Sequence, residues 1–143
     1  MNRIAIFDLD GTLADVTHRL HFLEEGKWDE FYLACNNDKP IDEIIALSRM
    51  MWHNSVPIFT LTGRSDIAKD KTIRWLNENN VLYDELFMRQ DGDYSHAEDL
   101  KEKWINEIGA NNIYCAFDDS AKVCNMFKRN GIITFHVNIG DNK

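Results

Sequence analysis

Five short apolar runs recur along the chain, and the segments between them carry helical patterns of hydrophobic residues. The runs occupy residues 3–7, 56–61, 84–88, 113–117 and 132–137. Their continuous apolar character is typical of strands that are covered on both faces. Strands that alternate with helices form parallel sheets with right-handed crossovers. The sequence therefore predicts an α/β fold of the Rossmann-like kind, with a parallel five-stranded sheet flanked by helices.

Helical periodicity predicts four helices between these strands, over residues 41–52, 66–79, 95–108 and 120–130. We expect Asp38 and Pro40 to open the first helix and Ser65 to cap the second. Ser95 and Glu98 have the spacing of a capping box at the start of the third helix.

Length and composition indicate an ordinary globular protein. The 143 residues favour a single domain over 1–143, and 44% of them are hydrophobic. No apolar run is long enough to span a bilayer and the N-terminus lacks a signal-peptide pattern, so we expect a cytoplasmic protein. Three cysteines without CxxC spacing are expected to be structural thiols. The net charge of −8 argues against tight, sequence-independent binding of nucleic acid, which depends on Lys and Arg.

One segment departs from the alternating pattern. Residues 16–39 lie between the first strand and its expected crossover helix, and they contain two short helical patterns, around 18–25 and 28–35. We interpret this segment as a small cap or lid insert over the mouth of the sheet. The alternative is a surface extension without a role at the mouth.

Polar side chains follow four of the predicted strands, at the point where each strand ends. They are Asp8 and Asp10; Thr62, Gly63 and Arg64; Arg89; and Asp118 and Asp119. Ligands bind outside the carboxyl ends of the strands in open parallel α/β sheets. The sequence therefore predicts a reaction site at this edge rather than an unrelated turn after each strand.

The acidic residues of this set point to a hard metal ion. Asp8 and Asp10 flank a single residue, and Gly11 permits a tight turn directly after them. Asp118 and Asp119 supply further carboxylate oxygens, which Mg²⁺ prefers as ligands. Because no His/Cys cluster has zinc spacing, we predict Mg²⁺ rather than zinc.

Lys101 occupies an unusual position on its predicted helix. At about 100° per residue it falls inside the apolar stripe formed by Ala97, Leu100, Trp104 and Ile108. A lysine that faces a core must reach out to water or neutralise an anion. We therefore expect Lys101 either to extend past the core or to meet a phosphate at the same sheet edge.

These motifs, taken together and in order, resemble those of the haloacid dehalogenase superfamily of aspartate-nucleophile phosphotransferases. The elements are "DLDGT" after the first strand, "TGR" after the second, a helix lysine, and "DD" after the fourth strand. The resemblance covers nearly the whole chain and implies a phosphatase, a hydrolase of phosphoric monoesters.

A closer resemblance is to the 3′-phosphatase domain of phage-type polynucleotide kinase-phosphatases. That domain has an arginine eleven residues after its nucleophile, as Arg19 follows Asp8 here, and an arginine in its second motif, as Arg64 stands here. It also has an arginine twelve residues before its motif lysine, which corresponds to Arg89 and Lys101. The chain has no GxxxxGK[ST] loop, so only the phosphatase half is implied, with no kinase domain.

The resemblance implies roles for these residues. Asp8 would be the nucleophile, Asp10 the general acid and base, and Thr62 and Lys101 the catalytic residues that hold the phosphate. Mg²⁺ would be held by Asp8, the main-chain carbonyl of Asp10, and Asp118 or Asp119. Substrate-binding residues would be Arg19, Gly63, Arg64 and Arg89.

The implied substrate is a phosphorylated nucleotide or a nucleic-acid 3′ end. Two alternatives stay open from the sequence. One is a phosphatase of free 5′-nucleotides or other small phosphomonoesters, and the other is a non-catalytic phosphate-binding module.

Overall fold

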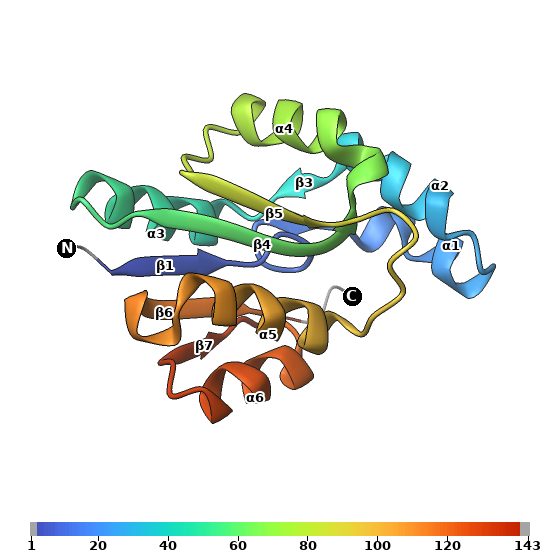
Figure 1. Ribbon diagram of the computed structural model, residues 1–143. Helices are drawn as coiled ribbons and strands as arrows, with labels where there is room; N and C mark the ends of the chain where they lie inside the picture. Colours follow the sequence, from blue (N-terminus) through green and yellow to red (C-terminus); the bar gives the residue numbers. More distant parts are fainter. Residues whose placement is uncertain (1–2, 141–143) are drawn as a thin grey trace.

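The computed structural model describes residues 3–140 and contains the predicted parallel sheet (Figure 1). The strand order is β5-β4-β1-β6-β7, and every neighbouring pair is parallel. The strands are β1 (Ile4–Phe7), β4 (Ile58–Ser65), β5 (Glu85–Arg89), β6 (Ile113–Asp118) and β7 (Thr134–His136). The prediction of five parallel strands is confirmed within the described residues.

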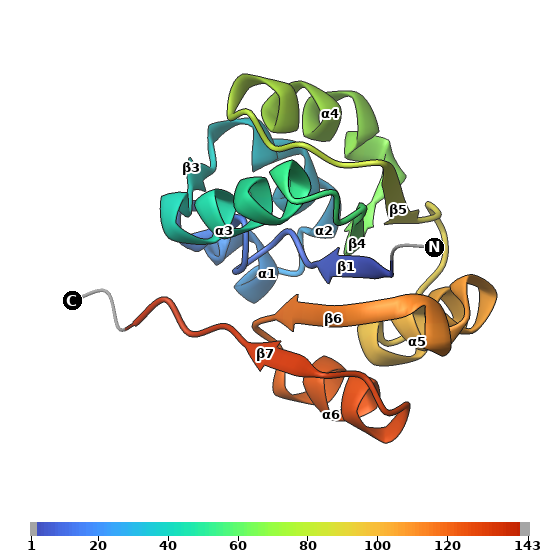
Figure 2. The same cartoon turned by 90° about the vertical axis from the view of Figure 1, so that its left-hand side faces the viewer.

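Helices cover both faces of this sheet. One face carries α3 (Asp42–His53) and α4 (Lys69–Glu78), and the other carries α5 (Ala97–Ile108) and α6 (Ala121–Arg129), as Figures 1 and 2 show. Each face has its own hydrophobic core: Phe7 and Trp75 belong to the first, and Ile6, Trp104 and Phe127 belong to the second. Burial on both sides explains why the strands read as continuous apolar runs.

Two of the predicted helix starts are wrong in detail. Ile41, rather than Asp38 or Pro40, is the residue before α3, and Pro40 lies in a short strand. His96, rather than Ser95, precedes α5 and makes no side-chain cap. The backbone N–H and the hydroxyl of Ser95 both donate to Oδ1 of Asp93, at 2.9 and 2.5 Å. The Asx-type turn at Asp93 therefore takes the place of the predicted capping box.

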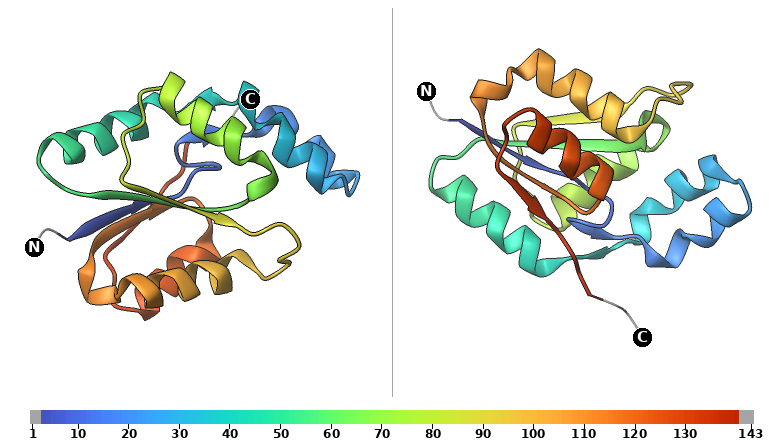
Figure 3. Two further views of the ribbon diagram at one scale, coloured as in Figure 1. Left: turned by 45° about the horizontal axis from the view of Figure 1, so that its top comes forward. Right: turned by 90° about the horizontal axis from the view of Figure 1, so that it is seen from below.

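The insert after β1 forms a small helical lid beyond the carboxyl ends of the strands (Figure 3). It contains a 3-10 helix over Thr17–Arg19, then α1 (His21–Glu24), α2 (Trp28–Leu33) and a second 3-10 helix over Ala34–Asn37. Its two ends pair as a small antiparallel sheet, β2 (Ala14–Asp15) with β3 (Lys39–Pro40). Strands of two residues carry no readable pattern, so the sequence did not predict this sheet.

The remaining expectations concern thiols and membranes. Cys35, Cys115 and Cys124 are buried free thiols. Among residues 3–140, no helix has both the length and the apolar character needed to cross a membrane.

Candidate active site

The ends of three neighbouring strands, β1, β4 and β6, bring the predicted site residues to one edge of the sheet. Asp8 directly follows β1, and Asp118 is the last residue of β6. Thr62, Gly63 and Arg64 lie inside β4, which is longer than predicted, and the pairing of β4 with β5 is irregular between Thr62 and Ser65. The irregularity lies next to Arg64, whose side chain contacts Asp10 in the loop after β1.

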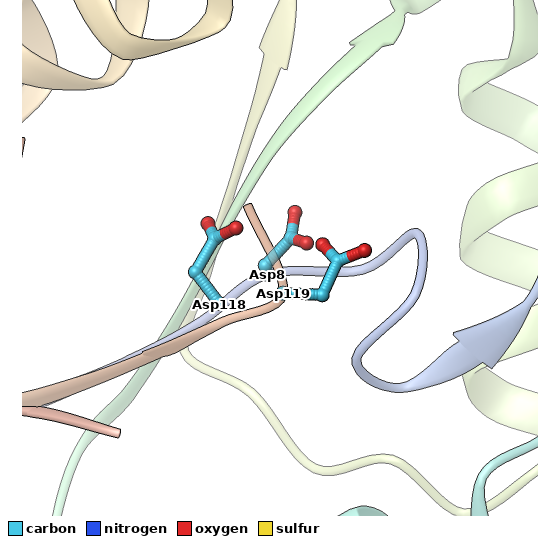
Figure 4. A group of neighbouring side chains, drawn as sticks. All are labelled: Asp8, Asp118 and Asp119. Atoms are coloured by element: carbon cyan, nitrogen blue, oxygen red, sulfur yellow. The ribbon is translucent and has the colours of Figure 1, made fainter. Parts of the chain in front are cut away.

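Three carboxylates form the centre of the site. Asp8, Asp118 and Asp119 each offer an oxygen atom, and these atoms all lie within 4.8 Å of one another (Figure 4). Asp8 and Asp118 are buried, whereas Asp119 is exposed. The side chain of Asp10 is not part of this group.

Lys101 extends from α5 into the acidic group. Its Nζ donates to Oδ1 of Asp8 at 2.8 Å and to Oδ2 of Asp118 at 2.7 Å, and the residue is only 3% exposed. Lys101 therefore lies within the apolar stripe of α5 and binds the buried carboxylates of Asp8 and Asp118 rather than water. The other Asp118 oxygen accepts the backbone N–H of Ser120, the N-cap of α6, at 2.9 Å.

The acidic group remains electrically unbalanced. Burial, together with the charge of Asp118, raises the pKa of Asp8 well above its usual value, and burial followed by Asp118 raises the pKa of Asp119. Burial alone lowers the pKa of a lysine, but Asp8 and Asp118 raise that of Lys101, so it stays protonated. With all three carboxylates ionised, one ammonium would leave two negative charges, which a bound divalent cation would neutralise.

Gly11 determines how closely the loop after β1 approaches Asp119. Its φ is +81°, in the left-handed region, and a Cβ built at this position would lie 2.1 Å from Oδ2 of Asp119. Only glycine leaves space for the carboxylate here.

Asp10 lies in a second, separate charged cluster. Its Oδ1 accepts from Nη2 of Arg19 at 3.0 Å and from Nη2 of Arg64. Burial alone would raise the pKa of Asp10, but Arg64 and Arg19 outweigh it and hold the pKa below its usual value. Both arginines are at most 1% exposed, so their guanidinium groups meet protein partners rather than solvent.

Asp38 completes this cluster and was not predicted as a site residue. Its carboxylate accepts from Arg19 at 2.8 Å and from Arg64 at 3.3 Å. The sequence pattern assigned Asp38, together with Pro40, to the start of the helix over 41–52. Its contacts come from residues 19 and 26 positions away, and no local signal indicates them.

Two buried threonines, Thr12 and Thr62, carry hydroxyl groups at this edge of the sheet. Thr12, which was not predicted either, donates to Oδ2 of Asp8 at 3.2 Å. The position of Thr12 in "DLDGT" was the available signal for it. Oγ1 of Thr62, a buried residue, accepts the backbone N–H of Arg64 at 3.0 Å, which leaves the hydroxyl proton of Thr62 free to donate to a ligand.

Arg89 lies apart from the other two arginines. Its Nε donates to the carbonyl of Gly63 at 2.7 Å, and Nη1 donates to the carbonyls of Asp93 and Ser95 at 3.0 and 2.6 Å. The structure therefore brings Arg19 and Arg64 together at Asp10, and it places Arg89 at Gly63 and the loop before α5.

Solved structures with this fold include phosphatases and repair enzymes. A chain of a Pnkp1/Rnl/Hen1 complex matches with a TM-score of 0.85 and 25% identity, over 99% of this chain and 48% of that one. A chain of the Pnkp1/Rnl/Hen1 RNA repair complex matches with 0.85 and 24%, over 99% and 44%. This chain therefore spans about half the length of these relatives.

More distant structures share the fold alone. The haloacid dehalogenase-like hydrolase SP0104 from Streptococcus pneumoniae has a TM-score of 0.67 and 14% identity, over 97% of this chain and 86% of that one. An enzyme of the same superfamily from Bacteroides thetaiotaomicron, in complex with magnesium and inorganic phosphate, has 0.62 and 10%, over 99% and 97%. Comparison with curated proteins finds no significant match.

The family comparison covers almost the whole chain. Residues 2–142 match the phosphatase domain of polynucleotide kinase PNKP. The α/β fold, the insert after β1 and the acidic group at the sheet edge agree with that match. The chain belongs to the PNKP phosphatase-domain family and is a phosphatase of the haloacid dehalogenase superfamily.

Proposed function

We propose that this protein is a Mg²⁺-dependent phosphomonoesterase that uses Asp8 as its nucleophile and removes 3′-phosphates from nucleotides or polynucleotide ends. The observation that carries this proposal is the separation of two carboxylates only two residues apart. Asp8 lies in an acidic group with Lys101, and Asp10 lies in an arginine cluster. Different surroundings for two neighbouring carboxylates are the basis for different chemical roles.

The acidic group suits Mg²⁺ in donor type and in charge. Asp8, Asp118 and Asp119 offer carboxylate oxygens, and with Lys101 they carry two uncompensated negative charges. The distant Bacteroides structure contains magnesium and inorganic phosphate on the same fold, which supports this choice. When bound, Mg²⁺ neutralises negative charge on the phosphoryl oxygens and on Asp8.

The chain's own residues account for two chemical steps. A carboxylate oxygen of Asp8 attacks phosphorus in line, the bond to the leaving oxygen breaks, and Asp10 gives that oxygen its proton. Asp10 then takes a proton from the water that attacks the aspartyl-phosphate, which releases inorganic phosphate and restores Asp8. Lys101 and the hydroxyl of Thr62 hold the phosphoryl oxygens throughout.

Asp10 needs a proton before the first step. Arg64 and Arg19 keep its pKa low in the structure, so the resting carboxylate is ionised. An approaching phosphate dianion repels this charge and thereby raises the pKa of Asp10. Substrate binding and protonation of Asp10 are therefore coupled.

The nucleotide part of the proposal rests on the family and on a neighbouring pocket. The pocket has a volume of about 370 Å³, adjoins Gly11 and Asp119, and lies between residues 15–20 at the base of the lid and residues 136–139. Apolar side chains such as Leu20 and Ile139 and polar ones such as Asn138 line it, a mixture that suits a nucleoside. The RNA repair assembly that contains a relative supports the same substrate class. Because Arg19 is fully buried, the proposal assigns it to Asp10 rather than to the substrate.

A substrate panel tests this function. We would measure kcat/KM for a 3′-phosphorylated oligonucleotide, a 3′-mononucleotide, a 5′-mononucleotide and a sugar phosphate, at one salt concentration, with Mg²⁺ or with EDTA. The proposal predicts preference for the 3′-phosphates and loss of turnover in EDTA. A preference for the 5′-nucleotide would support the free-nucleotide phosphatase instead, and turnover in a chelated preparation would exclude the metal's role.

A further inference from the structure

Asp38 is a buried carboxylate at the point where the lid returns to the core. Its Oδ1 accepts from Nε of Arg19 at 2.8 Å and contacts Nε2 of His18 at 2.7 Å. Its Oδ2 accepts from Nη2 of Arg19 at 2.8 Å and from Nη2 of Arg64 at 3.3 Å. The main-chain carbonyl of the same residue accepts from Nε1 of Trp75 at 2.8 Å, which fixes the backbone. Both carboxylate oxygens are thus fully engaged.

Two of the three guanidinium nitrogens that reach Asp38 also reach Asp10. Nη2 of Arg19 and Nη2 of Arg64 each donate to Oδ1 of Asp10 as well as to Asp38. Two carboxylates and two guanidinium groups balance in charge, which is the condition for burying such a cluster. Asp38 therefore competes with Asp10 for the arginines and holds them at fixed positions.

The arginines have further anchors that Asp10 does not share. Nη1 of Arg19 donates to the carbonyl of Phe31 at 3.1 Å, and its guanidinium lies 4.4 Å from the centre of the Phe31 ring. Nη1 of Arg64 donates to Thr72 at 2.9 Å. Among residues 3–140, the hydrogen bonds of the Asp10 carboxylate with the arginines all involve Oδ1, so Oδ2 is left for another partner.

We propose that Asp38 is a positioning residue for catalysis: it holds Arg19 and Arg64 so that they fix Asp10 by one oxygen and leave the other directed to the leaving group. The inference rests on the proposed role of Asp10 as general acid. A general acid must lie within hydrogen-bond reach of the oxygen that it protonates, and groups behind it must prevent it from turning away. Without Asp38, the two guanidinium groups lose the counter-charge that keeps them in place.

A leaving-group comparison separates this role from a merely structural one. Asp38→Asn keeps the shape of the side chain and removes its charge. Nitrophenolate leaves without protonation, whereas a nucleoside alkoxide requires it. We therefore expect Asp38→Asn to slow the single-turnover release of a 3′-nucleoside about 10- to 100-fold, less than the roughly 10²–10⁴-fold that general acid catalysis supplies, because Asp10 itself is still present. The first-turnover burst of nitrophenolate from p-nitrophenyl phosphate should change less than threefold.

The controls make each outcome interpretable. Asp84→Asn removes another carboxylate, one that accepts the backbone N–H of Ile58 at 2.9 Å, far from the arginines, and should leave both rates unchanged. Asp10→Asn should show the same selectivity as Asp38→Asn. If Asp10→Asn slows the nitrophenolate burst as much as nucleoside release, the general-acid role in the proposed function fails, rather than the role of Asp38.

The inference would be overturned by a folded Asp38→Asn protein in which nucleoside release and the nitrophenolate burst slow equally, or in which neither slows. This holds provided that Asp10→Asn slows nucleoside release more than the nitrophenolate burst. If Asp38→Asn does not fold, His18→Gln takes its place, because His18 is partly exposed and contacts only the outer side of the cluster. It should give a smaller loss, again confined to nucleoside release, and equal changes in both rates would again reject the proposal.

Discussion

Replacing Gly11 by alanine should disable the site through one carboxylate. The new Cβ would lie 2.1 Å from Oδ2 and 2.5 Å from Cγ of Asp119, distances that no real contact tolerates. The side chain of Asp119 is flexible and exposed, so we expect it to move by about 1 Å rather than the backbone to rearrange. A displacement of about 1 Å at a reacting centre can reduce the rate about 100-fold.

The stability effect of the same substitution has a different cause and can be measured separately. Gly11 has a φ of +81°, and placing a side chain in the left-handed region costs about 1–2 kcal/mol. Gly131 provides a matched control, with a φ of +74° and no atom within 4 Å of a built Cβ. Gly11→Ala and Gly131→Ala should therefore lose similar stability, while only Gly11→Ala loses activity.

The assay combines denaturant unfolding with phosphatase kinetics at several Mg²⁺ concentrations. We expect a lower kcat and a weaker apparent Mg²⁺ affinity for Gly11→Ala, and wild-type values for Gly131→Ala. If Gly11→Ala keeps kcat and its Mg²⁺ dependence within twofold of wild type, Asp119 has no role that depends on its position, and the metal site is assigned incorrectly.

Three further predictions follow from the buried groups. Asp8→Asn should fold and lose all detectable phosphate release, because an amide is a poor nucleophile; activity near the wild-type level would exclude the covalent mechanism. Lys101→Met should abolish activity and also destabilise the metal-free protein by about 3–5 kcal/mol, since it leaves the Asp8 and Asp118 carboxylates buried without their cation. Added Mg²⁺ should restore part of that stability in a thermal melt. An unchanged melting temperature with and without Mg²⁺ would contradict the proposal that Lys101 balances the charge of these carboxylates. Burial raises the pKa of Cys115 and of Cys124 to about 11, so iodoacetamide should modify the native thiols slowly at pH 8 and faster toward pH 11. The folded protein holds these two thiol protons more tightly than the unfolded chain does. The free energy of unfolding that they contribute is therefore fully present below about pH 9 and is lost as the pH rises toward 11. Rapid labelling of Cys115 and Cys124 in the native protein at pH 8 would refute both the slow-labelling prediction and this pH dependence.

The sheet was predictable because strands that are buried on both faces appear in the sequence as short apolar runs. β1 (IAIF) and most of β6 (IYCAF) are apolar runs in the centre of the sheet, whereas the edge strand β7 (TFH) is largely exposed. The acidic residues lie at the ends of the two central strands, with Asp8 directly after β1 and Asp118 as the last residue of β6. Lys101 was predictable for a related reason, since a charged residue inside an apolar helical stripe must have an unusual partner. The structure supplies that partner as two carboxylates.

Features that depend on distant contacts were not predictable in this way. Asp38 reads locally as a residue before a helix, and its partners, Arg19 and Arg64, are known only once the lid is folded against β4. The two-residue strands β2 and β3 are too short to show a period. Ser95 fits a capping box by spacing alone, but its backbone N–H is taken by Asp93. Local propensity in each case gives way to a tertiary or turn contact.

Trapping the aspartyl-phosphate would show whether phosphate passes through Asp8. A 3′-phosphorylated oligonucleotide would be mixed with enzyme and Mg²⁺, quenched in acid within the first turnover, and the protein digested for mass spectrometry. We expect a phosphate on the peptide that contains Asp8 of the wild-type enzyme. With p-nitrophenyl phosphate, whose leaving group needs no proton, the same peptide should stay phosphorylated longer in Asp10→Asn, because hydrolysis of the aspartyl-phosphate is slow. Product release without any phosphorylated peptide, or a phosphate on a different residue, would contradict the covalent mechanism.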